Sequence, residues 1–485
     1  MSDSGRVLVV DVGTSSVRAV VSDTAGNALH TVGRALPPDS PADGLVEFDA
    51  GRMAAVSLEL ATAALEAAGP VAAVGVSNQR GSTVVWDRAT GEPVGPGLGW
   101  QDLRTIGDCL ALRGEGVRVA PNQSATKVRW LLDQGGADAR DRDLCVGTVD
   151  SWIVWALSGG TAHVSDASNA AITGLCAADG AAEWDPAVLD ALGVPRRMLP
   201  EIVDSAGVVA EARALPGAPT VAALVGDQQA SLVGQGCLHP GPAKITFGTG
   251  GMLDLVLDER PTFAGRGGAG TFPIVARRID GTVTWGVEAI MLAAGTNVEW
   301  LCEGLGLAAS PAETHALASE CADSGGVMFV PALLGLGTPH WDYGARGTLV
   351  GLTRGTGRAE IARAVLEGVA HRGADLVEAA EADTGRSIPV VRVDGGMTDN
   401  PTFVQALADA TGRPVEVSPV REATARGAAL LAALAVGLHG SVDDLAATWA
   451  PRTRAEPEQT LDRDRWRAAV ERSAAWIPEL SGIDF

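Results

Sequence analysis

The chain has 485 residues, enough for two large domains, and its 46% hydrophobic and 20% charged residues are typical of a globular protein. The formal net charge of −22 argues against nucleic acid, phospholipid surfaces and polyanionic proteins as partners. Small phosphorylated anions remain possible ligands, because local turns and arginines can outweigh the overall charge.

Cysteine and histidine spacing excludes several kinds of site. The six cysteines show no Cys-x-x-Cys pair and the seven histidines no His-x-x-x-His pair, so neither a disulfide scaffold nor a transition-metal centre is expected. Because the chain enters a strand within its first ten residues, we expect no secretory leader. No apolar run reaches the roughly 18 to 20 residues that cross a bilayer. We expect a cytoplasmic protein without membrane contact.

The first predicted strand, Val7–Val10, carries Asp11 to its end and leads into a turn at Gly13. A second apolar run, Ala19–Val21, follows at once, so we predict strand-turn-strand. The spacing differs from the Gly-x-x-x-x-Gly-Lys-Ser/Thr loop that precedes a helix. The backbone N–H groups of this turn could cradle phosphate oxygens, although a hairpin with a structural glycine is the alternative.

The rest of the first half alternates strands and helices. We predict strands at Val71–Val76 and Thr83–Trp86 and helices at Met53–Ala68 and Ala125–Asp133. Residues 235–243 are predicted to be a turn-rich linker, so we place the boundary between two domains there, at 1–240 and 241–485. The second half repeats the scheme with a glycine hairpin over Ile245–Leu257, a strand before Asp394, and helices at Ile361–Glu381, Phe403–Ala410 and Ala423–Val436. The segment after Gly440 is predicted to be polar and helical.

Three glycine turns therefore follow strands: Gly13, Gly248-Thr249-Gly250 and Gly395-Gly396. Strands interleaved with helices give an α/β class, and a glycine hairpin opening each half suggests duplicated domains. We expect one nucleotide to be held in a cleft between the two lobes.

Asp227 follows a predicted strand and Gly226, where a carboxylate could act in catalysis or could cap a helix. Arg80 lies at the end of the predicted strand Val71–Val76, where α/β proteins bind ligands. Trp100 adds an aromatic ring with polar neighbours, and a buried structural tryptophan is the alternative.

Taken together, these motifs resemble the FGGY carbohydrate kinases from about Val7 to about Gly440, and among them most closely the glycerol kinases. The resemblance rests on Asn78-Gln79-Arg80, Trp100-Gln101, Thr126-Lys127-Val128, Gly226-Asp227-Gln228-Gln229-Ala230, Phe247-Gly248-Thr249-Gly250 and the signature spacing from Gly347 to Glu367. It implies two actin-like ATPase domains with ribonuclease-H-like cores, ATP and Mg²⁺ as cofactors, a small-molecule sugar or polyol substrate, and assembly into a homo-oligomer.

The resemblance also implies a role for each matching residue. Asp227 would be the general base, accepting the proton of the attacking hydroxyl, and Asp11 would hold Mg²⁺, with Asp227 also near the metal. Substrate-binding positions would be Arg80, Gly81, Trp100, Asn122, Asp227, Gln228 and Met252. Nucleotide-binding positions would be Gly13, Thr14, Ser15, Ser16, Arg18, Gly248, Thr249, Gly250, Gly295, Glu299, Gly395, Gly396 and Asn400.

The sequence departs from glycerol kinases around the substrate. Gly81 replaces a glutamate, Asn122 a tyrosine and Met252 a phenylalanine, and Glu299 replaces a glutamine near the nucleotide. Because lost hydrogen-bond partners change specificity, we expect a four- or five-carbon polyol or ketose as substrate. A glycerol kinase with a reorganised pocket is the alternative. A non-catalytic sugar or nucleotide sensor is a further one, which the retained Asp11 and Asp227 disfavour.

Overall fold

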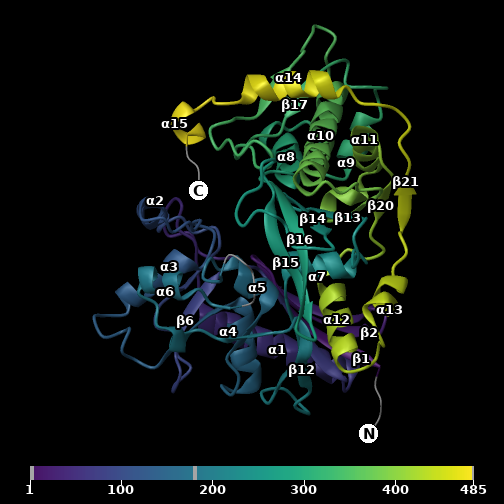
Figure 1. Ribbon diagram of the computed structural model, residues 1–485. Coiled ribbons are helices and arrows are strands. Elements are labelled where there is room, and N and C mark those ends of the chain that lie inside the picture. Colours follow the sequence, from purple (N-terminus) through teal and green to yellow (C-terminus); the bar gives the residue numbers. More distant parts are fainter. Residues whose placement is uncertain (1–4, 178–182, 483–485) are drawn as a thin grey trace.

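The computed structural model describes residues 5–177 and 183–482. Within them, thirteen strands form one large sheet, with strands of the first half at one end and strands of the second half at the other (Figure 1). In order across the sheet, the strands are β3 (Ala28–Ala35), β2 (Ser16–Asp23), β1 (Arg6–Val12), β5 (Ala73–Asn78), β12 (Thr220–Gly226), β11 (Ala206–Glu211), β15 (Phe272–Ile279), β16 (Thr282–Met291), β14 (Gly251–Val256), β13 (Ala243–Phe247), β19 (Val391–Asp394), β20 (Val415–Val417) and β21 (Thr453–Ala455).

The same strand order occurs twice in this sheet. In the first half β3-β2-β1 is antiparallel and continues in parallel into β5 and β12. In the second half β16-β14-β13 is antiparallel and continues in parallel into β19 and β20. The halves join where Ala206 of β11 pairs with Ile279 of β15. This repetition confirms the α/β class and agrees with the duplication suggested by the glycine hairpins.

Helices and smaller sheets complete the molecule. The helices are α1 (Ala50–Ala68), α2 (Ile106–Gly114), α3 (Ala125–Gln134), α4 (Val149–Ser158), α5 (Ala167–Ile172), α6 (Pro186–Leu192), α7 (Asp227–Gly234), α8 (Gly295–Glu299), α9 (Glu313–Ala318), α10 (Arg358–Thr384), α11 (Pro401–Thr411), α12 (Ala423–Ala435), α13 (Val442–Ala447), α14 (Arg463–Ser473) and α15 (Pro478–Ser481). A four-stranded sheet contains β4 (Glu47–Phe48), β7 (Gly97–Leu98), β6 (Thr83–Asp87) and β8 (Leu144–Thr148), while β9 (Val164–Asp166) pairs with β10 (Glu201–Val203) and β17 (Met328–Val330) with β18 (Thr348–Val350).

The predicted elements are present, with shifted ends that have local causes. Helix α1 starts three residues before the predicted Met53, because the Asp49 side chain accepts a hydrogen bond from the Arg52 N–H at 2.8 Å and caps it. The prediction for the segment after Gly440 was wrong in one respect. This segment contains the strand β21, which pairs with β20, in addition to helices.

Apolar side chains cover the large sheet in separate clusters for the two halves. Helix α12 is the exception to this division, because it belongs to the second half of the chain and packs on β1, β5 and β12 of the first (Figure 1). It also crosses α7. A Cβ on Gly427 of α12 would lie 1.8 Å from the Ala230 carbonyl oxygen, and one on Gly234 of α7 would lie 2.0 Å from the Ala423 carbonyl oxygen. The two helices can therefore cross this closely only through glycine.

Three arginines fix the end of α7. Arg426 donates to the Gly234 carbonyl at 2.9 Å, Arg392 to the Gln235 carbonyl at 2.9 Å and Arg277 to the Leu238 carbonyl at 2.7 Å. Cations at the carboxyl end of a helix stabilise it through its dipole and its free carbonyls. Helix α7 is thus held in place by its close crossing with α12 and by the arginines at its carboxyl end. These contacts fix the orientation of the helix and therefore the position of its first residue, Asp227.

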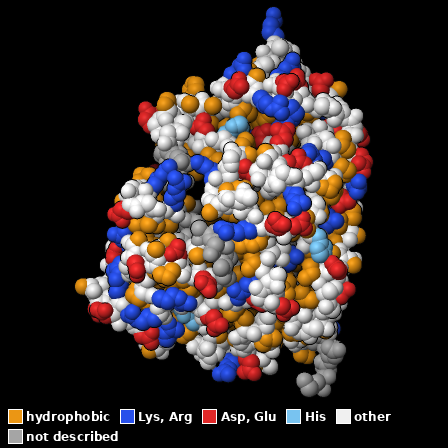
Figure 2. Space-filling model, in the orientation of Figure 1, with side chains coloured by type: hydrophobic (Ala, Val, Ile, Leu, Met, Phe, Trp, Pro, Cys, Tyr) orange, Lys and Arg blue, Asp and Glu red, His pale blue; other side chains and the backbone are white. Residues whose placement is uncertain are grey.

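The surface bears both signs of charge. On the face shown in Figure 2, acidic and basic side chains are interspersed, so the net charge of −22 is not gathered there into one acidic patch. Among the described residues, no helix has the length and apolar character needed to span a membrane.

Candidate functional site

Asp11 is the last residue but one of β1 and lies buried at the predicted turn. The Ser77 hydroxyl donates to its carboxylate at 2.8 Å, and the Arg18 guanidinium is 3.2 Å from its other oxygen. The Gly13 N–H donates to the Ser16 carbonyl at 2.9 Å, which closes the turn before β2 begins. The predicted strand-turn-strand is confirmed, and Thr14 and Ser15 lie at its tip.

The electrostatics around Asp11 favour a cation. Burial raises the pKa of Asp11 to about 6, while Arg18 and the Ser77 hydroxyl oppose this, and the negative charges of Glu422 and Asp227 add to it. A divalent ion beside these carboxylates would offset their burial and repulsion. The described residues contain no cluster of three or more metal-ligating His, Cys, Asp or Glu side chains. One or two carboxylates with phosphate and water are the usual ligands of Mg²⁺, so the residues present fit this ion.

Asp227 is the first residue of α7, directly after β12, and its side chain is 30% exposed. Its carboxylate accepts a hydrogen bond from the Gln228 N–H at 2.8 Å and lies 3.5 Å from the Arg80 guanidinium. Burial raises the pKa of Asp227, and the Arg80 charge opposes the rise. A partly accessible carboxylate of raised basicity is suited to accepting a proton from a bound hydroxyl.

Arg80 connects the two halves beside Asp227. Its guanidinium is 2.6 Å from the Glu288 carboxylate of β16 and 3.4 Å from the Gln229 side-chain oxygen. Burial raises the pKa of Glu288 to about 7, with Arg80 opposing. Glu288 was not predicted from the sequence. The signal for it was a single acid within the apolar run Val287–Met291, on a strand that the sequence analysis did not identify.

Three of the predicted substrate positions, Gly81, Asn122 and Trp100, lie against one another next to Arg80. The Trp100 indole N–H donates to the Thr14 hydroxyl at 3.1 Å, which brings the aromatic ring to the β1–β2 turn. Gly81 has φ +71°, and a Cβ there would lie 2.5 Å from the Asn122 carbonyl oxygen. The structure therefore places Gly81 against Asn122 and Trp100. Met252 lies on β14, opposite Thr246 on one side and Ile290 on the other.

The glycine turns of the second half also meet. The Gly295 N–H donates to the Gly248 carbonyl and the Ala294 N–H to the Thr249 carbonyl, both at 2.8 Å. Gly395 has φ +91°, and a Cβ there would lie 2.3 Å from the Phe247 carbonyl oxygen. The segments around Gly248, Gly295 and Gly395 are thus in mutual contact, as a shared nucleotide site requires.

The remaining predicted nucleotide positions are peripheral to this contact. The Asn400 side chain caps α11 by accepting from the Phe403 N–H at 3.2 Å, and it donates to the Thr314 hydroxyl at 2.9 Å. Glu299 ends α8 with an exposed side chain, and Gly396 is exposed beside Gly395.

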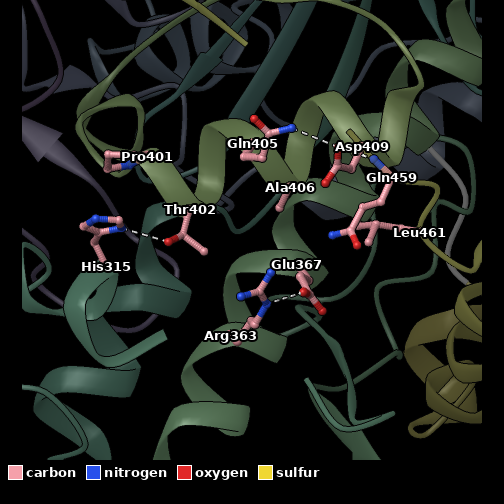
Figure 3. Close-up of a pocket in the computed structure, with 10 residues that line it drawn as sticks. All are labelled: His315, Arg363, Glu367, Pro401, Thr402, Gln405, Ala406, Asp409, Gln459 and Leu461. Atoms are coloured by element: carbon pink, nitrogen blue, oxygen red, sulfur yellow. Dashed lines mark hydrogen bonds and ion pairs between the residues drawn. The ribbon is translucent and has the colours of Figure 1, made fainter. Parts of the chain in front are cut away.

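A separate pocket of about 320 Å³ contains none of the predicted residues (Figure 3). It lies between α9, α10, α11 and the segment that leads to α14. His315 contacts Thr402 at 2.8 Å and Arg363 contacts Glu367 at 2.8 Å within it. The part of its lining that α11 supplies starts at Pro401, directly after Asn400, so the pocket adjoins a predicted nucleotide position without including Asp11 or Asp227.

Comparison with known proteins matches nearly the whole chain. The model of the N-terminal domain of the FGGY family of carbohydrate kinases matches residues 6–234, and that of the C-terminal domain matches residues 243–436. A glycerol kinase from Alkalilimnicola ehrlichii is 43% identical over 97% of this chain and 98% of its own length. A glycerol kinase from Aromatoleum aromaticum is 42% identical over 97% of this chain and 99% of its own.

Solved structures have the same architecture. The Plasmodium falciparum glycerol kinase with ADP superposes with a TM-score of 0.89 at 26% identity, covering 96% of this chain and 98% of that one. A xylulose kinase from Rhodospirillum rubrum, at 22% identity, has a TM-score of 0.84 and covers 98% of this chain and 99% of its own, which shows a common fold. The fold is the two-domain actin-like ATPase fold.

Proposed function

The chain belongs to the FGGY family of carbohydrate kinases and is an ATP-dependent sugar or polyol kinase, and we propose that its substrate is glycerol. The observation that carries this choice is the likeness to glycerol kinases at about 40% identity over nearly the full length of both chains. The product would be glycerol 3-phosphate.

We propose that Asp227 is the general base of this transfer. The oxygen of a terminal hydroxyl attacks the γ-phosphorus of ATP, the bond to the β–γ bridging oxygen breaks, and the hydroxyl proton passes to the Asp227 carboxylate while ADP leaves. The position of Asp227 at the start of α7, 3.5 Å from Arg80, supports this role. Arg80 would orient a substrate oxygen, since Glu288 holds its guanidinium from the other side.

Asp11 would hold Mg²⁺, through water or directly, and the ion would neutralise charge on the phosphates. The glycine segments around Gly248, Gly295 and Gly395 would contact the nucleotide through backbone N–H groups. Their mutual contact supports one nucleotide site.

A second candidate substrate is a four- or five-carbon polyol or ketose. The observation in its favour is the replacement of three family residues by Gly81, Asn122 and Met252. It is the weaker candidate, because Gly81 lies against the Asn122 backbone, and this contact fills part of the space that a lost glutamate would leave.

Steady-state kinetics test the substrate. ADP release would be measured with glycerol, erythritol, xylitol, ribulose and xylulose at saturating MgATP. We expect kcat/KM to be highest for glycerol. A four- or five-carbon compound with a kcat/KM above that of glycerol would overturn the proposal and establish the second candidate.

The variant Asp227→Asn tests the base. It should lose about 10²- to 10⁴-fold in kcat, because a general base contributes rate of that order. Binding of ATP, followed by calorimetry, should be retained, since the substituted side chain keeps its shape. A kcat close to that of the parent would contradict the assignment.

A further inference from the structure

Lys244 and Asp254 form a buried ion pair behind the candidate site. They lie opposite each other in the β13–β14 ladder, with 2.6 Å between the Lys244 Nζ and an Asp254 carboxylate oxygen, and both side chains are 0% exposed. Lys244 is one of only two lysines in the chain. A buried ion pair is no more stabilising than a well-packed apolar pair of similar size. Its presence in the core of a sheet therefore points to a use other than stability.

The pair contacts the site through Gln228. The Lys244 Nζ donates to the Gln228 side-chain oxygen at 2.7 Å. An ammonium group has donors and no acceptor, so the atom that faces it must be the amide oxygen. The amide NH₂ then points away from Lys244. Since Gln228 follows Asp227 and is only part buried, this NH₂ is available to a ligand.

Asp254 has one buried carboxylate oxygen without a hydrogen bond to any described residue, which a role in stability does not explain. Only one of its oxygens is bound to Lys244, and the other is buried without a hydrogen-bond partner among the described residues. On β16, its neighbour in the ladder is Glu288, another acid. A half-satisfied carboxylate next to a like charge destabilises the fold. Its effect on Lys244 is the opposite, because the contact at 2.6 Å holds the buried ammonium group in place.

We propose that the Lys244–Asp254 pair positions Gln228 and fixes it as a hydrogen-bond donor to an oxygen of the substrate. Asp227 accepts a proton from the substrate, and its neighbour Gln228 is held in the complementary role. Lys244 and Asp254 are positioning residues and do not touch the substrate. This inference rests on the proposed function only in that Gln228 binds the phosphoryl acceptor, whichever polyol or sugar that is.

The first test replaces the pair by apolar residues of similar size, Lys244→Met with Asp254→Leu. The double variant should keep the thermal midpoint of the parent within a few degrees, whereas Lys244→Met alone should lower it because Asp254 is left as an unpaired buried charge. If the pair positions Gln228, the double variant should still show a KM for the acceptor raised about 10-fold, equivalent to one lost hydrogen bond. The KM for ATP should change less than 2-fold.

A second test uses Gln228→Glu and does not depend on the core. A glutamate at 228 can still accept from Lys244, but it has no NH₂ to offer the substrate. We expect the thermal midpoint to be unchanged or raised and the acceptor KM to rise about 10-fold or more. The triple variant that combines Gln228→Ala with the Met/Leu double variant should have the same acceptor KM as Gln228→Ala alone. The reason is that both changes remove the same contact with the substrate.

The matched control is Arg363→Met with Glu367→Leu, which removes a mostly buried ion pair in the pocket of Figure 3. It should leave the acceptor KM unchanged. The proposal is overturned if Gln228→Glu keeps the parent KM, or if a folded Met/Leu double variant does so. All assays use the acceptor that the parent phosphorylates best. A parent that prefers a compound other than glycerol would contradict the proposed substrate and leave this test intact.

Discussion

Substitution of Gly427 by alanine should separate the two crossing helices and reduce catalysis without touching the site. Gly427 belongs to α12 and faces α7, the helix whose first residue is Asp227. The added Cβ would lie 1.8 Å from the Ala230 carbonyl oxygen, which is backbone and cannot rotate away. The strain must be relieved by movement of a helix.

The size of this movement follows from ordinary contact distances. Carbon and carbonyl oxygen approach to about 3.3 Å, so α7 and α12 must move apart by roughly 1.5 Å at this point. Overpacking of this kind costs about 1 to 3 kcal/mol of stability. Misplacement of a catalytic group by about 1 Å can reduce the rate roughly 10²-fold. We therefore expect kcat to fall by about two orders of magnitude in a variant that remains folded.

The assay is steady-state kinetics together with thermal unfolding. Gly107→Ala is the control, because Gly107 lies in helix α2 with no atom within 4 Å of an added Cβ, and alanine favours a helix there. It should keep the parent kcat and midpoint. Gly75→Ala on strand β5 is a milder perturbation of α12, since its Cβ would lie 2.7 Å from the Ala428 carbonyl oxygen of that helix. A folded Gly427→Ala variant with kcat within 2-fold of the parent would refute the reasoning.

Three further predictions concern the metal, the pH and the substrate loop. Asp11→Ala should raise the Mg²⁺ concentration needed for half-maximal rate about 10-fold or more, with an unchanged acceptor KM, as a Mg²⁺ titration would measure. Burial lowers the pKa of His163 to about 4, so its ring stays neutral in the folded chain while the unfolded ring titrates near 6.5. The stabilisation is complete well above pH 6.5 and is lost as the pH falls toward 4, and the loss is about 2 kcal/mol at pH 5. His163→Gln should therefore flatten the fall in thermal midpoint between pH 7.5 and 5, and an unchanged slope would contradict this. Gly81→Glu should raise the acceptor KM, because φ is +71° and the Cβ would lie 2.5 Å from the Asn122 carbonyl oxygen; a lower KM for glycerol would show that the loop adapts.

The parts of the site that sequence reasoning found are those with a local signal. Asp11 lies near the end of a valine-rich strand, two residues before Gly13, and Asp227 follows an apolar run and Gly226, so each position can be inferred from its neighbours in the chain. The glycine turns were visible for the same reason. That Gly248 and Gly395 share one nucleotide was expected from the three glycine turns themselves. Gly295 was added only by the resemblance to a family, because no strand or glycine motif marks it in the sequence.

The parts that were missed depend on pairing between distant strands. Glu288 and Asp254 are neighbours only because β16 pairs with β14 in a register that puts both on the face toward Arg80 and Gln228. A shift of one residue would turn them to the other face. The strand β21 was missed because a polar edge strand of three residues has no pattern of its own, and its pairing with β20 defines it.

Three polar groups at the site, Arg80, Gln228 and Arg18, are each contacted by a residue from the other half of the chain. Glu288 holds Arg80, Lys244 holds Gln228, and Glu422 contacts Arg18, which in turn contacts Asp11. The orientation of these groups therefore depends on how the two halves are packed together. That packing is set where α7 crosses α12 and where arginines bind the end of α7. It follows that substitutions at the crossing should alter kcat, whereas substitutions in the pair behind Gln228 should alter the acceptor KM, and kinetics can distinguish the two.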